Sequence, residues 1–207
     1  MGCQPLVTIS ASYGAGGSRV GPLLAERLDV AFAARLVLPG IADRLEAAPA
    51  VPGHDDEPVG RSLGRLLRQL TGERPPAAPL LNEASAIADA EYRRVREQEI
   101  LALVDGGAVI LGRAAAVVLR DVPQALHVRM CGPRELRIEQ AMVVEGIDGD
   151  AARWRQATED LARDAYVRHF YGVDPLDAKL YHLVIDSTRL SLDACVEAIA
   201  AAALAVA

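Results

Sequence analysis

Short apolar runs alternate with longer amphipathic stretches along most of the chain. Runs of about four to eight apolar or β-branched residues are typical of buried strands, and a 3.6-residue period is typical of helices. The runs begin at Leu6, Arg35, Ala108, Ala125 and Leu183. Helical patterns cover about 19–28, 114–119, 133–144, 151–171 and 192–207, the last with Ser191 as N-cap. This alternation predicts an α/β fold with a mostly parallel, five-stranded sheet and helices on both faces.

One region interrupts the alternation. Between residues 39 and 105 the chain carries helical patterns at about 39–47, 61–70 and 82–105, separated by proline-rich stretches at 48–58 and 72–79. Asn82 or Ser85 is the predicted N-cap of the third helix. The sequence therefore predicts a core of residues 1–38 and 106–207 with a helical insertion at 39–105, over the carboxyl edge of the sheet.

A glycine-rich loop follows the first strand. It reads Gly14-Ala15-Gly16-Gly17-Ser18-Arg19 and leads into a helix whose apolar stripe faces the sheet. Glycines allow positive φ, and the N-terminus of a helix offers free N–H groups and partial positive charge. The junction therefore favours an anion such as a phosphate, and the alternative is a turn that only joins a strand to a packed helix.

The loop matches the phosphate-binding pattern G-x-x-x-x-G-K-[ST] in part. Gly16-Gly17-Ser18 stands in the place of G-K-[ST], so the hydroxyl is present and the lysine is absent, and Ala11 replaces the first glycine. The Ser18 hydroxyl is a candidate Mg²⁺ ligand, and an N-cap role for Ser18 has equal weight.

Charge and composition exclude several classes of protein. The net charge of −6 argues against a nucleic-acid-binding surface, and the balance of 51% hydrophobic and 24% charged residues is typical of a soluble globular protein. Lys179 is the single lysine, so any phosphate site depends on arginine. Three isolated cysteines and the lack of a signal or membrane-spanning stretch predict a cytoplasmic protein that binds no membrane. Whether copies of the chain associate stays open.

Charged residues collect where the predicted strands end. The carboxyl ends of parallel strands meet in one crevice, which brings Arg113, the segment 131–134 and the segment 186–188 near the glycine loop. Arg134 and Arg137 share a helix face at i and i+3. The long helix carries Asp160 and Arg163. Structural pairing of Arg113, and solvated surface roles for the helix charges, are the competing interpretations.

Several separated motifs resemble the bacterial cytidylate kinase-like family, a branch of the P-loop nucleoside monophosphate kinases. The resemblance covers nearly the whole chain apart from about 48–79. The motifs that carry it are Tyr13-Gly14-Ala15-Gly16-Gly17, Leu24-Ala25-Glu26-Arg27-Leu28, Val109-Ile110-Leu111-Gly112-Arg113, Glu135-Leu136-Arg137, Asp160-Leu161-Ala162-Arg163 with Tyr166, and Leu183-Val184-Ile185-Asp186-Ser187.

This resemblance implies a three-layer α/β/α core that uses ATP and Mg²⁺ to phosphorylate a nucleoside monophosphate, CMP or dCMP. The glycine loop from Gly14 to Arg19 would bind ATP, with the segment Asp186-Ser187 against the adenine. Arg113 and Arg137 would hold the acceptor, and a lid-like segment at 150–175 would supply Asp160 and Arg163. Asp160, Arg163 and Arg19 are the catalytic candidates, and Arg19 is the candidate substitute for the absent lysine.

The chain also departs from the family pattern. Ala11 stands where the family carries arginine, and Ser18-Arg19 where it carries arginine and then glutamate. Ala33-Ala34 replaces an aspartate, and Tyr181-His182 stands in place of a tyrosine–aspartate pair. Loss of one transition-state donor costs roughly 10²–10³ in rate. A non-catalytic protein that keeps the fold and binds nucleotide, and a kinase for another small acceptor, are therefore the alternatives.

Replacement of Arg113 tests the predicted acceptor site. We expect Arg113→Ala to weaken acceptor binding far more than ATP binding, because the guanidinium is predicted to meet the acceptor phosphate. Calorimetric titration of each nucleotide measures the two effects. Equal losses for both nucleotides, or no loss, would contradict the role.

Overall fold

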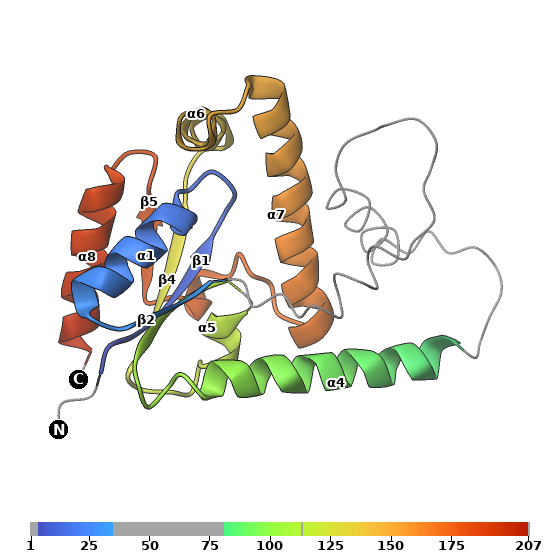
Figure 1. The fold of residues 1–207 in the computed structure, drawn as a ribbon. Helices are drawn as coiled ribbons and strands as arrows, with labels where there is room; N and C mark the ends of the chain where they lie inside the picture. Colours follow the sequence, from blue (N-terminus) through green and yellow to red (C-terminus); the bar gives the residue numbers. More distant parts are fainter. Residues whose placement is uncertain (1–3, 35–80, 113, 207) are drawn as a thin grey trace.

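The fold is built on a parallel sheet with helices on both faces (Figure 1). The structure, a computed structural model, describes residues 4–34, 81–112 and 114–206, with the backbone alone for 81–89. The strands are β1 (Leu6–Ala11), β2 (Ala31–Ala34), β3 (Ala108–Leu111), β4 (Ala125–Cys131) and β5 (Leu183–Asp186). The helices are α1 (Gly17–Leu28), α4 (Leu81–Leu101), α5 (Ala115–Val118), α6 (Arg134–Glu145), α7 (Gly149–Tyr171) and α8 (Leu192–Ala205), with a short 3₁₀ turn η1 (Ala178–Leu180).

The sheet order is β2-β3-β1-β4-β5, and every pairing is parallel. β1 lies at the centre, with Leu6 opposite Ala108 of β3 on one side and Ala125 of β4 on the other. The glycine loop that follows β1 therefore leaves the middle of the carboxyl edge, between the ends of β3 and β4. The predicted five-stranded parallel sheet is confirmed.

Each face of the sheet has its own apolar core. On one face, Val7 and Ile9 of β1 and Val128 of β4 pack with α1 and α8, in a cluster that includes Leu24 and Ile199. On the other face, a smaller cluster joins Leu6, Ala108 and Ile110 to Ile100 of α4 and to Ala115 and Leu119. Alternating side chains of one strand thus supply both cores, which is the period-2 pattern of a strand covered on both faces.

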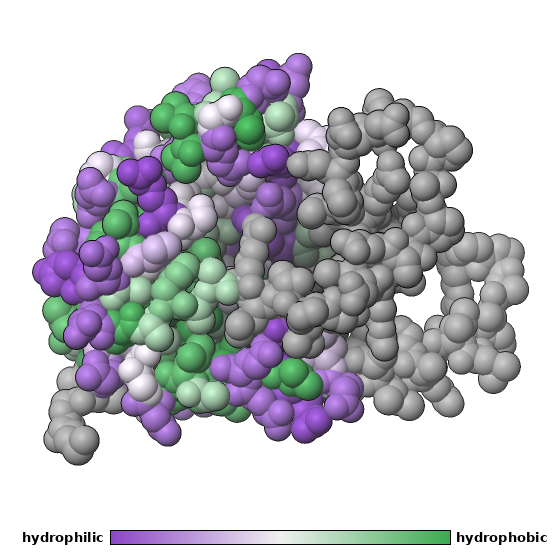
Figure 2. Space-filling model, in the orientation of Figure 1, coloured by the Kyte–Doolittle hydropathy of each residue, from purple (hydrophilic) through white to green (hydrophobic). Residues whose placement is uncertain are grey.

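Helices α6 and α7 contact each other beside the carboxyl end of the sheet, and they cross at a steep angle (Figure 1). Asp148 caps α7 by accepting a hydrogen bond from the N–H of Ala151, and Gly146 and Gly172 end the two helices with positive φ. Hydrophobic residues gather on the surface of α6 in Figure 2, where Val143 and Val144 are exposed. No helix among the described residues is long and apolar enough to cross a membrane.

Two boundaries differ from the sequence-based prediction. The second strand is Ala31–Ala34, just before the predicted start at Arg35. Residues 35–38 lie outside the described part of the chain, and so do the segments predicted at 39–47, 48–58, 61–70 and 72–79. Three of its four residues are alanine, which gives a weak strand signal. Asn82 and Ser85 do not cap α4, because the helix already includes Leu81. Ser191 does cap α8, with its Oγ 3.1 Å from the N of Ala194.

A stacked histidine pair lies on β4 and just before β5. The rings of His127 and His182 are 4.8 Å apart between centroids, and the Nδ1 of His127 is 2.8 Å from the Thr8 Oγ1. His127 is 3% exposed, and its Nε2 has no partner among the described residues. Burial, together with the nearby His182, lowers the pKa of His127 from 6.5 to about 4.

Protein stability should therefore fall as the pH drops from about 6.5 to about 4. In that window the unfolded chain protonates His127 and the folded chain does not, and a difference of this size corresponds to roughly 3 kcal/mol. Urea unfolding at a series of pH values measures it. His127→Gln should flatten the curve in this window, and the control His169→Gln, on exposed α7 surface, should keep the wild-type slope. An unchanged slope in His127→Gln would refute the assignment.

Candidate functional site

The glycine loop presents unused N–H groups at the carboxyl edge of the sheet. Gly14 and Gly16 each have a φ of 75°, and Gly16 is the N-cap of α1 with no side-chain capping bond. In the described part of the chain, the N–H groups of Gly14, Gly16, Gly17 and Ser18 donate to no protein acceptor, whereas the Ala15 N donates to the Ser12 O. Free N–H groups at a helix N-terminus are a site for an anion.

Close packing beneath the loop fixes its path. A Cβ added to Gly14 would lie 2.1 Å from the Arg137 O of α6, and one added to Gly16 would lie 2.5 Å from Leu192. The Gln140 Nε2 donates to the Gly14 O at 2.9 Å, and the Ser187 Oγ donates to the Ala15 O at 2.8 Å. The carbonyl groups of the loop are thus bound to the protein, which leaves its N–H groups for a ligand.

Asp160 and Arg137 bind the two ends of residue Tyr13. The Asp160 Oδ1 accepts from the Tyr13 N at 2.7 Å, and the Arg137 Nη1 donates to the Tyr13 O at 2.5 Å. The two side chains also pair with each other at 2.9 Å, and the Gln156 Nε2 donates to the Asp160 Oδ2 at 2.8 Å. Helices α6 and α7 therefore both hold the loop through a bonded, largely buried ion pair.

The side chain of Tyr13 adds a third contact with these helices. Its hydroxyl donates to the Glu145 Oε2 at 2.8 Å, and Arg155 of α7 pairs with the same carboxylate at 3.0 Å. Burial, and then the hydrogen bond to Glu145, raise the pKa of Tyr13 well above its usual range. The phenol is therefore neutral at physiological pH and serves as a donor.

Arg163 lies at the entrance to the loop. Its Nη1 donates to the Ala11 O at 3.1 Å, and its Nη2 pairs with Glu159 at 2.6 Å. Its side chain is 39% exposed, so the residue lies partly at the surface. α7 therefore brings a positive charge to the junction where the loop itself lacks a lysine.

The end of β3 lies next to the loop. The Gly112 N donates to the Ile9 O at 2.8 Å, and Gly112 and Ala114 have φ values of 81° and 56°. A non-glycine residue with positive φ carries local strain, which is typical of functional segments. Arg113, between them, lies outside the described residues, so its predicted acceptor role stays a prediction.

The segment after β5 closes the other side of the site. The Thr188 Oγ1 and N donate to the Asp186 Oδ1 at 2.6 and 3.0 Å, which lowers the pKa of Asp186 below its usual value. The side chain of Ser187 is fully buried against Ala15. Ser187 therefore positions the loop, and its predicted nucleotide contact is left to the backbone.

The geometry changes two other predictions, on Ser18 and Arg137, and agrees with a third, on Arg134. Ser18 is exposed on the first turn of α1 and is not the N-cap, which is Gly16, so the capping alternative is wrong. Arg19 is exposed beside it. Arg137 is 8% exposed and bonded to Gly132, Tyr13 and Asp160, so it holds the loop and is not open to an acceptor as predicted. Arg134 does share its face, because it bonds Gln156 of α7.

The sequence analysis missed Arg96. This α4 residue is 1% exposed, pairs with Glu99 at 2.7 Å and lies over the Tyr92 ring at 5.2 Å. Its Nε is buried without a partner among the described residues. An unmade hydrogen bond on a buried cation is costly, so the atom is available to an anion. An arginine flanked by glutamates on a helix looks like solvated surface in sequence, and only the position of Ile100 one turn later, in the core, could have indicated burial.

The donor set fits polyphosphate better than a metal held by protein alone. The described residues contain no group of three His, Cys, Asp or Glu side chains able to hold a metal ion. Mg²⁺ in phosphoryl-transfer sites takes most of its ligands from phosphates and water, with one or two from protein. The exposed Ser18 hydroxyl could supply one such ligand beside the free N–H groups.

The parallel sheet order, with a glycine loop entering α1, is the fold of the P-loop kinases. The family model for the cytidylate kinase-like family matches residues 6–189, and the chain belongs to this family.

The similar proteins of known sequence or structure carry different names. A cytidylate kinase from Methanopyrus kandleri is 32% identical over 144 residues, covering 63% of this chain and 72% of that protein. A uronate isomerase from Corynebacterium glutamicum is 29% identical over 136 residues, and the chain spans 26% of its length. A solved structure of an uncharacterized protein from Eubacterium ventriosum shares the fold, with a TM-score of 0.59 and 18% identity over 97% of this chain and 98% of that one. Family and fold together support nucleotide kinase activity.

Asp160→Asn tests the hold on the loop. The amide offers only one acceptor oxygen where the carboxylate accepts from Tyr13, Arg137 and Gln156, so we expect a loss of about 2 kcal/mol in unfolding free energy. Urea unfolding measures it. Asp150→Asn is the matched control in the same helix, because its pair with Arg153 is exposed and should cost well under 1 kcal/mol. Equal costs for the two variants would overturn the assignment.

Proposed function

We propose that the protein transfers the γ-phosphoryl group of ATP to a nucleoside monophosphate, with CMP or dCMP as the preferred acceptor. The supporting observation is the row of four unused N–H groups in the glycine loop with the Arg163 guanidinium beside it. Phosphoryl transfer needs little beyond positioning and charge neutralisation, which N–H groups and guanidinium groups supply.

In this proposal the loop N–H groups bind the phosphates of ATP, and bound Mg²⁺, with Ser18 as one ligand, neutralises charge there. Arg163 lies close enough to the loop to stabilise the charge that develops on the transferred group. Because Gly17 occupies the lysine position of the phosphate-loop pattern, the proposal takes the positive charge near the loop from Arg163. Asp160 acts by holding Tyr13 and not by direct contact. Arg19 remains a further candidate for the phosphates.

On the acceptor side, the proposal assigns Arg113. Of the predicted acceptor-binding insertion 39–105, the structure describes residues 81–105, which include α4. The lid-like role of 150–175 falls to α7. CMP as the acceptor rests on family membership and on the cytidylate kinase relatives.

The second candidate is a nucleotide-binding protein without turnover. It is favoured by Ala11 in the place of the family arginine and by Ser18-Arg19 in the place of the family arginine and glutamate. Calorimetry with ATP and Mg²⁺, followed by an ADP-release assay against a panel of monophosphates, separates the two. Turnover highest with CMP or dCMP supports the first, turnover with another acceptor changes the substrate, and binding without turnover supports the second.

Arg163→Met tests the catalytic assignment. We expect kcat to fall roughly 10²–10³-fold with a much smaller change in the KM for ATP, because the guanidinium acts on charge that develops in the transition state. The steady-state ADP-release assay gives both values. Arg168→Met is the matched control, five residues along α7 and paired with Asp174 on the surface. A wild-type kcat in Arg163→Met would remove Arg163 from the mechanism.

A further inference from the structure

One face of the sheet is polar toward the carboxyl ends of β1 and β4. On β1 and just beyond it, Thr8, Ser10 and Ser12 alternate with the apolar residues that enter the larger core. The register places Thr8 opposite His127 and Ser10 opposite Arg129 of β4. A sheet face covered by a helix is usually apolar, because burying polar groups costs free energy unless they bond. These polar positions therefore serve specific contacts.

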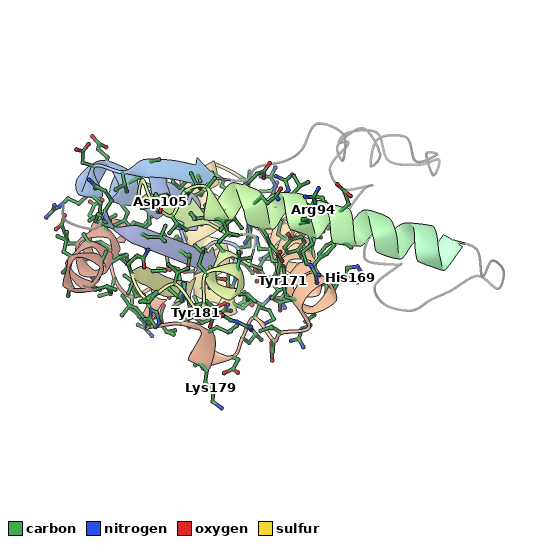
Figure 3. All side chains as sticks on the ribbon, turned by 90° about the horizontal axis from the view of Figure 1, so that it is seen from below. Arg94, Asp105, His169, Tyr171, Lys179 and Tyr181 are labelled. Atoms are coloured by element: carbon green, nitrogen blue, oxygen red, sulfur yellow. The ribbon has the colours of Figure 1, made fainter. Side chains whose placement is uncertain are left out.

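Arg129 is the centre of those contacts. Its Nη1 donates to the Pro175 O at 3.0 Å, and its Nη2 donates to the Ser12 Oγ at 3.4 Å. Its guanidinium carbon lies 5.7 Å from the Tyr181 ring centroid. The Tyr181 hydroxyl donates to the same Pro175 O at 2.9 Å and lies 3.2 Å from the Ser10 Oγ. Figure 3 shows Tyr181 beside the sheet, whereas Lys179 extends away from it.

These bonds fix the carboxyl end of α7 to the sheet. Pro175 follows Gly172, the C-cap of α7, by three residues, and its carbonyl accepts from both Arg129 and Tyr181. Asp164, one turn after Asp160, lies near enough to Arg129 to be attracted to it, although burial raises the pKa of its carboxyl group overall. α7 thus has one attachment on the loop, through Asp160 and Arg163, and a second on the sheet, through Pro175.

We propose that Arg129 is a positioning residue for phosphoryl transfer: it ties the end of α7 to Ser12 at the start of the glycine loop, and so holds Arg163 at the Ala11 carbonyl. The inference rests on the proposed function. Arginine suits the task because its planar fork reaches two separate acceptors while its face lies on an aromatic ring, a combination that lysine cannot reproduce.

The experiment compares Arg129→Met and Arg129→Lys with wild type in the ADP-release assay and by amide hydrogen exchange. We expect Arg129→Met to lower kcat about 10–100-fold with KM values changed less than about threefold, since a displaced Arg163 loses only transition-state charge stabilisation. Amide exchange over the last two turns of α7 should rise at least about tenfold, with β1 and β4 unchanged. Arg129→Lys should be intermediate. Arg27→Met, whose pair with Glu197 is exposed on α1 and α8, is the surface control.

A double variant decides whether Arg129 acts through Arg163. If Arg129 acts through Arg163, the kcat of the double variant should be less than about threefold below that of Arg163→Met alone, because the group that Arg129 positions is already gone. If the losses in kcat of the two single variants multiply in the double variant, the inference is overturned. It is also overturned if Arg129→Met lowers the melting temperature but leaves kcat and α7 amide exchange normal, because that is the result of a purely structural role.

Two safeguards keep the test decisive. If Arg129→Met does not fold, Tyr181→Phe removes one donor to the Pro175 carbonyl while keeping the ring, and it should raise exchange in the same part of α7. If wild type binds nucleotide without turnover, the proposed function fails. Amide exchange in α7 then still tests whether Arg129 and Tyr181 hold the end of α7, because unchanged exchange in both Arg129→Met and Tyr181→Phe refutes that attachment.

Discussion

The loop in this structure depends on one arrangement: Asp160 and Arg137 bind the N–H and the C=O of the same residue, Tyr13, and pair with each other. A glycine-rich segment loses more conformational entropy on ordering than any other kind, so it does not keep a single path unless neighbours fix it. Here the neighbours are α6 and α7, which lie more than a hundred residues later in the sequence. Their pair is largely buried, and every charged oxygen or nitrogen named in it has a hydrogen-bond partner, which is the condition under which burying an ion pair is tolerated.

This arrangement explains why the loop carbonyls are occupied while the N–H groups are not. Arg137, Gln140 and Ser187 each donate to a loop carbonyl, so the backbone dipoles are held with their positive ends toward the carboxyl edge of the sheet. Preorganised dipoles cost no reorientation when an anion arrives, and that is the physical basis of their strength. Tyr13 and Ala15 are the exceptions, because the Tyr13 N–H binds the Asp160 carboxylate and the Ala15 N–H binds the Ser12 carbonyl. Among the described residues, the N–H groups of Gly14, Gly16, Gly17 and Ser18 are left for an anion.

The sequence predicted the parts of this structure whose signal is local. Apolar runs placed four of the five strands, and the order of strands and helices gave the parallel sheet. Glycine spacing located the loop. The Ala31–Ala34 strand escaped because alanine carries little strand preference and because, among the described residues, the strand pairs with β3 alone, at the edge of the sheet. The role of Arg137 as a residue that holds the loop escaped for a different reason, as did Arg96 and Arg129 altogether. Their sequence neighbours are those of solvated helix or strand residues, and their roles come from contacts with residues far away in the chain, which no local pattern contains.

The missing lysine connects these observations. A lysine in the loop would move together with the loop. The distance between its positive charge and the loop N–H groups would then be set by one segment of the chain. With Gly17 in that position, Arg163 of α7 brings a guanidinium to the Ala11 carbonyl, and its distance from the loop depends on how α7 is held. Asp160 holds the middle of α7 at Tyr13, and Pro175, just after α7, is held by Arg129 and Tyr181. These contacts therefore fix the position of a positive charge that a loop lysine would fix by its place in the sequence. Loop and helix then have to act as one unit, and a change that loosens α7 is a change to the phosphate site itself.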